Sequence, residues 1–254
     1  MNNYKEENAD IDKLVAQIKE SSHCVAFTGA GISTLSGIPD FRSDKGIYNT
    51  GGSQEMFDLD VFLQDPSVYY DASRSLLYNL DAKKPSIVHT TLAKMEKQGY
   101  LQGVITQNVD LLHTRAGSQK VYEVHGSPSI HRCLRCGAQK SFDEIAPVVA
   151  QGEIPQCSKC RQAYKPEITF FGEALPQHTL NAAQQTARSA DLMLVLGSSL
   201  TVYPAAGLPE VAVRHGAKLA IINQQNTYMD PLAQFRFQDL QQVFERINDK
   251  LFED

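Results

Sequence analysis

The amino-acid sequence contains no run of about 18 apolar residues, the length that a membrane-spanning helix requires. Its first ten residues, MNNYKEENAD, are polar and lack the charged-then-apolar order of a secretory signal peptide. From these two absences we expect a cytoplasmic protein with no membrane partner.

Basic residues are not in excess either. Twenty-four Lys and Arg stand against 29 Asp and Glu, which gives a formal net charge of −5. Binding to a nucleic-acid backbone needs a basic face that neutralises phosphates, so the charge argues against nucleic acid as the main partner, although a local basic patch stays compatible with it.

Cysteines are few, and five in a chain without an export signal are poor material for a disulfide scaffold. Four of them form two pairs, Cys133-x-x-Cys136 and Cys157-x-x-Cys160, separated by twenty residues. This spacing is typical of a tetrahedral zinc site, and four thiolates leave no position for water, so we predict one structural zinc per chain. Cys24, inside an apolar run, is expected in the core.

The paired cysteines have two other interpretations, a redox dithiol and a nucleic-acid-binding zinc ribbon. A redox dithiol needs only one such pair. A nucleic-acid-binding zinc ribbon draws some support from nearby basic residues, but four thiolates on Zn²⁺ leave a charge of −2 at the site, which weakens that case.

The apolar residues predict an α/β fold. A sequence of 254 residues with 42% apolar composition can bury a full core. Short apolar runs at 23–28, 103–106, 121–124, 192–196 and 219–222 alternate with mostly helical patterns. Helices are expected over 11–18 and 240–247, where apolar residues recur at helical spacing. This alternation predicts a doubly wound parallel sheet covered on both faces.

Two stretches, 43–84 and 129–165, interrupt this alternation. We interpret them as insertions that build a smaller module over the sheet, a helical segment at 45–84 and a four-cysteine zinc ribbon at 129–165. The main Rossmann-like domain is then expected to comprise residues 1–44, 85–128 and 166–254.

Polar motifs directly follow the predicted strands. They are 29–33 (GAGIS), 107–110 (QNVD), 125–126 (HG), 197–199 (GSS) and Asn223. Because open α/β sheets bind ligands at the carboxyl ends of their strands, five strand ends are predicted to converge on one crevice.

The first of these motifs is a glycine turn that favours a pyrophosphate ligand. Gly29-x-Gly31 after a strand lets backbone N–H groups approach a phosphate. Thr34 stands where a dehydrogenase has its third glycine, and no second strand ending in Asp or Glu follows, which argues against hydride transfer. Phe41 could cover a flat ring and Arg42 could bind phosphate, although an ordinary turn is the alternative.

Together the motifs resemble the sirtuin family. GAGIS (29–33), GIPDFR (37–42), TQNVDLLHTRAG (106–117), VHG (124–126), the paired C-x-x-C, FFGE (170–173) and GSSL (197–200) follow the family's order along nearly the whole chain. The chain is most similar to prokaryotic members with a compact catalytic core. The resemblance implies a Rossmann-like domain, a small zinc module, NAD bound between them, and NAD-dependent removal of acyl groups from protein lysines.

The resemblance also implies residue roles. The acyl oxygen of an acyl-lysine attacks C1′ of the nicotinamide ribose and expels nicotinamide, and the acyl group then passes to ADP-ribose. His125 is the expected general base, Asn108 is expected to bind ribose hydroxyls or order a water, and Asp110 to hold the nicotinamide carboxamide. Turn or helix-cap roles are the alternative for Asn108 and Asp110.

The expected NAD contacts are spread over both halves of the crevice. They are Ala30, Gly31, Ser33, Thr34, Phe41, Arg42, Gln107, Asn108, Val109, Asp110, His125, Gly197, Ser198, Ser199, Asn223 and Asp239. The last is expected on the adenine side, in a region, 223–239, that is shorter than the family's.

An extended segment, 165–173, is expected to accept the substrate peptide as an added β-strand. Its predicted contacts are Thr169, Phe170, Phe171, Gly172 and Glu173. The two phenylalanines could line a tunnel for the acyl-lysine, but neighbours on a strand point to opposite faces, so one of them could equally be a core residue. Thr169 departs from the family, which usually has an apolar β-branched residue there.

The acyl group is expected to be neutral. Sirtuins that remove acidic acyl groups resemble one another in a tyrosine followed three residues later by an arginine. Here Tyr70 is followed by Ser73, and Arg74 comes one residue late. Two rival functions stay open: mono-ADP-ribosyl transfer from NAD to a protein, and a module that only senses NAD or ADP-ribose.

Overall fold

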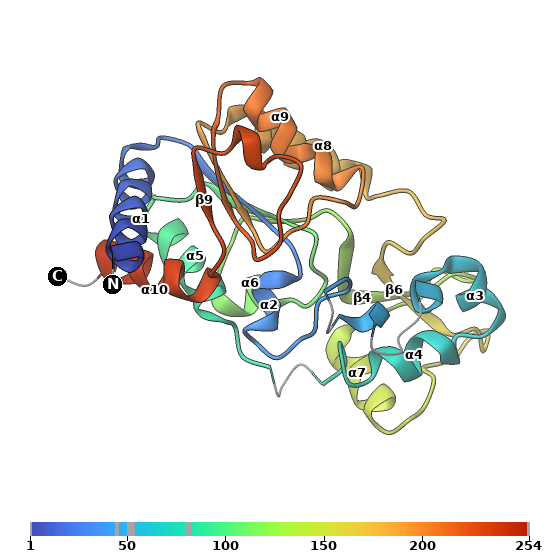
Figure 1. The fold of residues 1–254 in the computed structure, drawn as a ribbon. Coiled ribbons are helices and arrows are strands. Elements are labelled where there is room, and N and C mark those ends of the chain that lie inside the picture. Colours follow the sequence, from blue (N-terminus) through green and yellow to red (C-terminus); the bar gives the residue numbers. More distant parts are fainter. Residues whose placement is uncertain (1, 44–45, 50–53, 80–82, 253–254) are drawn as a thin grey trace.

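A computed structural model describes residues 2–43, 46–49, 54–79 and 83–252. Figure 1 shows a central sheet with helices on both faces and, beside it, a smaller lobe of helices and short strands. The predicted domain limits at residues 1, 44, 45 and 254 lie outside the described residues, and the division into two domains stays a prediction.

The central sheet has six parallel strands in the order β3-β2-β1-β7-β8-β9. They are β1 (Cys24–Thr28), β2 (Gly103–Thr106), β3 (Val121–Glu123), β7 (Leu192–Leu196), β8 (Lys218–Ile222) and β9 (Phe235–Phe237). The doubly wound parallel sheet is confirmed, and five strands coincide with the predicted apolar runs. The sixth, β9, was missed because Arg236 separates its two phenylalanines, so the strand forms no continuous apolar run.

Helices cover both faces because successive residues of a strand point to opposite sides. Ala26 of β1 belongs to the core formed with α1 (Asn2–Glu20), α5 (Ile87–Lys97) and α10 (Leu240–Phe252). Phe27 belongs to the core formed with α8 (Gln177–Ser189) and α9 (Leu208–Arg214). In Figure 1, α8 and α9 lie on one side of the sheet and α1 and α10 on the other.

The smaller lobe contains a three-stranded antiparallel sheet in the order β5-β4-β6. Its strands are β4 (Gly126–Cys133), β5 (Gln139–Ser141) and β6 (Tyr164–Ile168). With α3 (Leu59–Gln64), α4 (Ser67–Ser73) and α7 (Phe142–Ala150), they enclose an aromatic-rich core. Both predicted insertions contribute to this lobe, and β4 and β6 extend past the predicted limits of the second.

Short elements complete the chain. They are α2 (Gly31–Thr34), α6 (Leu112–Ala116) and the 3-10 turns η1 (Ile47–Asn49), η2 (Gln54–Phe57), η4 (Ala205–Gly207) and η5 (Asp230–Leu232). In the described part of the chain, every helix is too short or too polar to cross a membrane.

Candidate active site

A cavity of about 1110 Å³ lies at the carboxyl ends of the parallel strands. Five of those strands are followed by residues that line it: Gly31 after β1, Gln107 after β2, His125 after β3, Gly197 after β7 and Asn223 after β8. The smaller lobe supplies the facing wall through residues 168–173. This is the position in which open α/β sheets bind ligands.

Most of the predicted NAD contacts line this cavity. They are Ala30, Gly31, Thr34, Phe41, Arg42, Gln107, Asn108, Val109, His125, Gly197, Ser198, Ser199, Asn223 and Asp239. The predicted substrate residues at 169–173 line it as well. Ser33 and Asp110 do not, because they lie beneath its wall, only 1% and 5% exposed.

Sequence reasoning missed several lining residues, among them Tyr48, Phe57, Gln224 and Leu240. Gln224 adjoins a predicted contact at the end of β8, and Leu240 adjoins Asp239, so extending those motifs by one residue would have found both. Tyr48 and Phe57 come from the first insertion, where no motif marks them.

Two glycine turns meet at the floor of the cavity. The N–H of Gly31 donates to the carbonyl of Gly197 over 2.9 Å. A Cβ on Gly31 would lie 2.7 Å from the Cα of Gly197, and Gly197 adopts a φ of +60° that side chains disfavour. Only glycine at both positions lets the loops after β1 and β7 approach this closely.

Asn108 is held in one orientation by hydrogen bonds. Its Nδ2 group donates to the carbonyl of Gly29 over 3.2 Å and to Oγ of Ser33 over 3.1 Å. Ser33 in turn donates to Oδ2 of Asp110 over 2.6 Å, and Oδ1 of Asp110 accepts from the N–H of Leu112. Because both amide hydrogens of Asn108 are used, its Oδ1 acceptor is the group that remains for a ligand in the cavity.

His125 has the geometry of a general base. Its Nδ1 lies 3.0 Å from the carbonyl oxygen of Gln107, which can only accept, so Nδ1 carries the proton and Nε2 keeps its lone pair. Burial lowers the pKa of His125 and the hydrogen bond to Gln107 opposes that shift. The ring is therefore neutral near pH 7 and able to accept a proton.

Glu123 is a titratable neighbour that the sequence did not reveal. It lies at the end of β3, two residues before His125, and accepts a hydrogen bond from Ser127 over 3.2 Å. Burial raises the pKa of Glu123 to about 7, and the charge of Asp110 adds to the rise. In the sequence it was part of an apolar run with no polar motif.

The predicted peptide segment is anchored by a buried cation. Nζ of Lys165, 4% exposed, contacts Oε2 of Glu173 at 2.7 Å, donates to the carbonyl of Ile168 over 2.8 Å and lies 4.1 Å from the ring centre of Phe170. The same Oε2 accepts from the N–H of Phe170 over 2.8 Å. Burial lowers the pKa of Lys165, and the carboxylate of Glu173 opposes this. Through Lys165 and the N–H of Phe170, the carboxylate of Glu173 holds the segment 165–173 in place.

The two phenylalanines of this segment differ in exposure. Phe170 is 1% exposed and packs edge-on against Phe57 and Phe62, whereas Phe171 is 46% exposed. Both line the cavity. Phe170 is therefore also a core residue of the smaller lobe, which is the alternative that strand geometry had left open.

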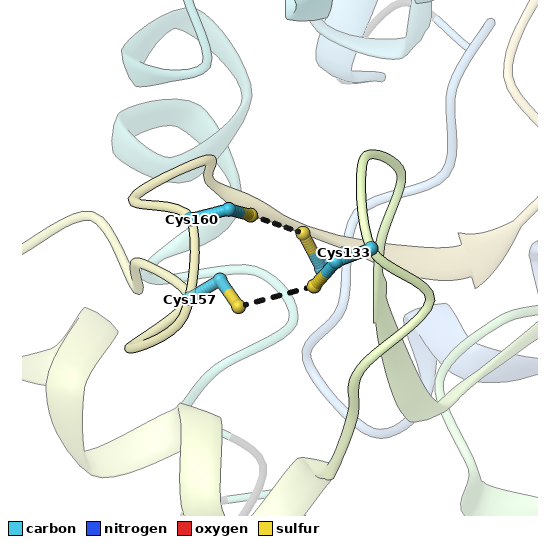
Figure 2. A group of neighbouring side chains, drawn as sticks. Cys133, Cys157 and Cys160 are labelled. Carbon is cyan, nitrogen blue, oxygen red and sulfur yellow. Dashed lines mark hydrogen bonds between the residues drawn. The ribbon is translucent and has the colours of Figure 1, made fainter.

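The four paired cysteines form one cluster, shown in Figure 2. All four sulfurs lie within 4.8 Å of one another, with Cys133 and Cys160 3.3 Å apart and Cys136 and Cys157 3.5 Å apart. Zn–S bonds of about 2.3 Å would set the sulfurs of a tetrahedral site roughly 3.8 Å apart. These four thiolates could hold one zinc ion. They would occupy all four positions of a tetrahedral site, so none would remain for a catalytic water.

The cavity also fits NAD. Nε2 of Gln107 is buried and finds no hydrogen-bond partner among the described residues, while Oε1 of Gln107 accepts from Ser198 over 3.1 Å. A Cβ on Gly29 would approach the carbonyl of Gly197 to 2.8 Å, so the loops after β1 and β7 can also pack closely at this position only because Gly29 has no side chain. An unpaired donor and a glycine-lined floor suit a polar ligand with a pyrophosphate.

Known proteins resemble this chain along most of its length. A model described as the Sir2 family matches residues 29–204. The chain is 44% identical to the NAD-dependent protein deacetylase of Thermotoga maritima, over 87% of this chain and 89% of the relative. It is 42% identical to NAD-dependent protein deacylase 2 of Archaeoglobus fulgidus, over 88% of each.

Solved structures agree with this likeness. A Sir2 variant with a deacetylated p53 peptide and 3′-O-acetyl-ADP-ribose has a TM-score of 0.89 and 40% identity, covering 95% of this chain and 98% of that one. Sir2 with a p53 peptide and NAD⁺ has a TM-score of 0.86 and 39% identity, covering 94% and 98%. Sir2Tm with a propionylated peptide has a TM-score of 0.85 and 39% identity, covering 94% and 98%.

Purified protein should carry about one zinc per chain, measured by elemental mass spectrometry. Cys133→Ser should lose the metal and the cooperative thermal transition together, because a structural zinc contributes directly to folding. Cys24→Ala, which removes the one cysteine outside the cluster, is the matched control and should keep its zinc. A zinc-free Cys133→Ser protein with unchanged melting and activity would contradict the prediction.

Proposed function

The chain belongs to the Sir2 family, and from that premise we propose that the cavity at the strand ends is its catalytic centre, with His125 as general base. The protein is an NAD-dependent protein-lysine deacylase. It converts NAD, acyl-lysine and water into nicotinamide, O-acyl-ADP-ribose and lysine. The observation that carries the proposed site is the His125 ring, half-buried and neutral, with Nδ1 hydrogen-bonded to the carbonyl of Gln107.

NAD supplies an electrophilic ribose carbon and nicotinamide as the leaving group. We propose that Nε2 of His125 accepts the proton of a ribose hydroxyl, so that the acyl group can transfer to it. The hydrogen bond to Gln107 keeps the ring in the required tautomer. No hydride moves, in agreement with the missing third glycine of the dehydrogenase motif.

Asn108 is proposed to act through its Oδ1. The atom is a partial negative charge, fixed in place before the ligand arrives, beside a ribose that becomes positively charged as nicotinamide leaves. The same acceptor can bind a ribose hydroxyl or order a water. Asp110, which lies beneath the cavity wall, is proposed to hold Ser33 and, through it, Asn108 by hydrogen bonds. It is also proposed to accept a hydrogen bond from the carboxamide when the nicotinamide ring enters past Val109.

The remaining NAD contacts are proposed from their positions. The turns at Gly31 and Gly197 receive the pyrophosphate, and exposed Arg42 lies at the same cavity. The adenosine side is proposed at residues 198–199, Asn223 and Asp239, which line the same cavity.

We propose that the acyl-lysine peptide adds as a strand at Gly172. Thr169 and Phe171 already donate their N–H groups to His125 and Phe57, over 2.7 Å each. Among the described residues the backbone N–H and carbonyl of Gly172 make no hydrogen bond. Solved relatives contain acetylated and propionylated peptides, which supports a peptide substrate. The cytoplasmic location expected from the sequence stays a prediction.

His125→Ala should lower deacylation by roughly two to four orders of magnitude, the usual loss for a general base, and leave NAD binding in place. Turnover is followed by mass spectrometry of the peptide together with nicotinamide release, and NAD affinity by calorimetry. Equal yields of nicotinamide and free lysine are expected in the parent enzyme. Transfer of ADP-ribose to the peptide instead would favour the rival transferase function, and loss below tenfold would remove His125 as the base.

The lowered pKa of His125 predicts the acid limb of the pH profile. A histidine must be neutral to act as a base. The value of kcat/KM should therefore be maximal above the pKa that His125 has in the folded protein and should fall as the pH drops through it, with a midpoint below the ordinary 6.5. Glu123, whose pKa lies near 7, titrates in a similar range, so Glu123→Gln is the control and should retain the limb. An acid limb above pH 7 that disappears in Glu123→Gln would assign the titration to Glu123.

Neutral acyl-lysines should be preferred over succinyl- or malonyl-lysine. The guanidinium of Arg74 is engaged by Asp71 at 2.6 Å and by the carbonyl of Val149 at 2.9 Å, and the hydroxyl of Tyr70 donates to the carbonyl of Tyr164. Both of these side chains are therefore engaged elsewhere and do not bind the carboxylate of an acidic acyl group, which is costly to bury unpaired. The measurement is kcat/KM for matched acetyl and succinyl peptides. A succinyl value equal to or above the acetyl value would refute the preference, and Arg74→Ala would test whether that side chain is responsible.

A further inference from the structure

A group of buried polar side chains lies beneath the cavity without lining it. Thr28 is 0% exposed, Thr106 2%, His113 3% and His89 0%, and none of them contributes to the cavity wall. The proposed reaction uses none of these groups. Burying polar atoms away from water is costly unless they pair with one another, so their pairing pattern is informative.

The hydroxyls of Thr28 and Thr106 form a continuous chain of hydrogen bonds, the path, between His113 and Asn108. Nε2 of His113 lies 2.9 Å from Oγ1 of Thr28, which donates to Oγ1 of Thr106 over 2.8 Å. Oγ1 of Thr106 then accepts the backbone N–H of Asn108 over 3.0 Å. Because the hydroxyl hydrogen of Thr28 goes to Thr106, Thr28 can only accept from His113, so Nε2 of His113 carries its proton.

A second histidine adjoins the end of this path. The ring centres of His89 and His113 are 4.7 Å apart, and Nδ1 of His89 accepts the N–H of Ser86 over 3.2 Å. Burial lowers the pKa of both rings, that of His89 to about 4, so both are neutral in the working range of pH. A neutral ring has one donor and one acceptor, so with the proton of His113 on Nε2, its Nδ1 is the acceptor.

We propose that Thr28, Thr106 and His113 form a buried hydrogen-bond relay that positions Asn108 for catalysis and, through Ser33, also Asp110. The inference rests on the proposed function, because it takes Asn108 as the group that faces the ribose. The relay holds the backbone of Asn108 at Thr106, while Gly29 and Ser33 hold its side chain. With both ends held, Oδ1 keeps one direction.

The packing of the sheet does not by itself require threonine at these two positions. Thr28 and Thr106 are directly paired across β1 and β2, and both strands are buried on both faces. A valine would fill the same space and satisfy the strand equally well, but it would leave the N–H of Asn108 and Nε2 of His113 without their partners. The hydroxyl therefore serves the loop after β2 rather than the packing of the sheet.

The test compares Thr106→Val with Thr106→Ser. Thr106→Val should lower kcat about tenfold, the size expected for one lost orienting hydrogen bond, with KM for the acyl-peptide within twofold of the parent. Thr106→Ser restores the hydroxyl and should recover most of kcat. Thr91→Val is the matched control: Thr91 is buried on α5 and its Oγ1 has no partner among the described residues, so kcat should not change.

Thr28→Val provides a second variant on the same path. It should reproduce the loss in kcat, and the double variant Thr28→Val/Thr106→Val should be no slower than Thr106→Val alone, because both break one relay. Melting temperatures are recorded for every variant. A loss in kcat that Thr106→Ser does not recover, or that Thr91→Val shares, would assign the threonines to stability alone.

Asn108→Ala separates the inference from the function on which it rests. If Asn108→Ala is strongly impaired while Thr106→Val and Thr28→Val keep the parent kcat, the relay is overturned and the role of Asn108 stands. If Asn108→Ala itself keeps full activity, the proposed role of Asn108 fails, whatever the threonine variants do.

Discussion

The register of β1 between its two parallel neighbours is the constraint on which the site depends. Thr28, the last residue of β1, pairs with Thr106 of β2 and Leu196 of β7, so the three loops begin at the same level. The N–H of Gln107 then donates to the backbone carbonyl of Thr28, and that of Gly29 to the backbone carbonyl of Leu196, over 3.0 Å each. A slip of one residue would turn these side chains to the opposite face and separate the loops that form the cavity.

The two sheets are joined at His125. It lies between β3 of the central sheet and β4 of the smaller sheet, and its carbonyl accepts the N–H of Thr169 from the peptide segment. Cys133 ends β4, so the cysteine cluster lies at the far end of a strand that begins directly after His125. A structural metal bound there would stabilise β4 and its pairing with β6, which ends directly before Thr169, although the metal itself would lie far from the reaction.

Burial sets the charge state of the groups around the reaction. Desolvation favours neutral His125, His89 and His113, raises the pKa of Glu123 and lowers that of Lys165, which Glu173 and backbone carbonyls hold. The proposed position of the ribose, which becomes positively charged in the reaction, is therefore flanked by a neutral histidine ring and by fixed dipoles.

The sequence by itself determined the parallel sheet, the four-cysteine cluster and most of the cavity wall, because these follow from short-range patterns: apolar runs, paired cysteines and motifs that directly follow strands. It did not reveal β9, the lining residues from the first insertion, or the pKa of Glu123. Nor did it reveal that Asp110, a predicted ligand contact, lies beneath the cavity wall and accepts a hydrogen bond from Ser33. These features depend on which distant segments pack against a residue, since burial and hydrogen-bond partners are properties of the tertiary structure and have no local signal in the chain.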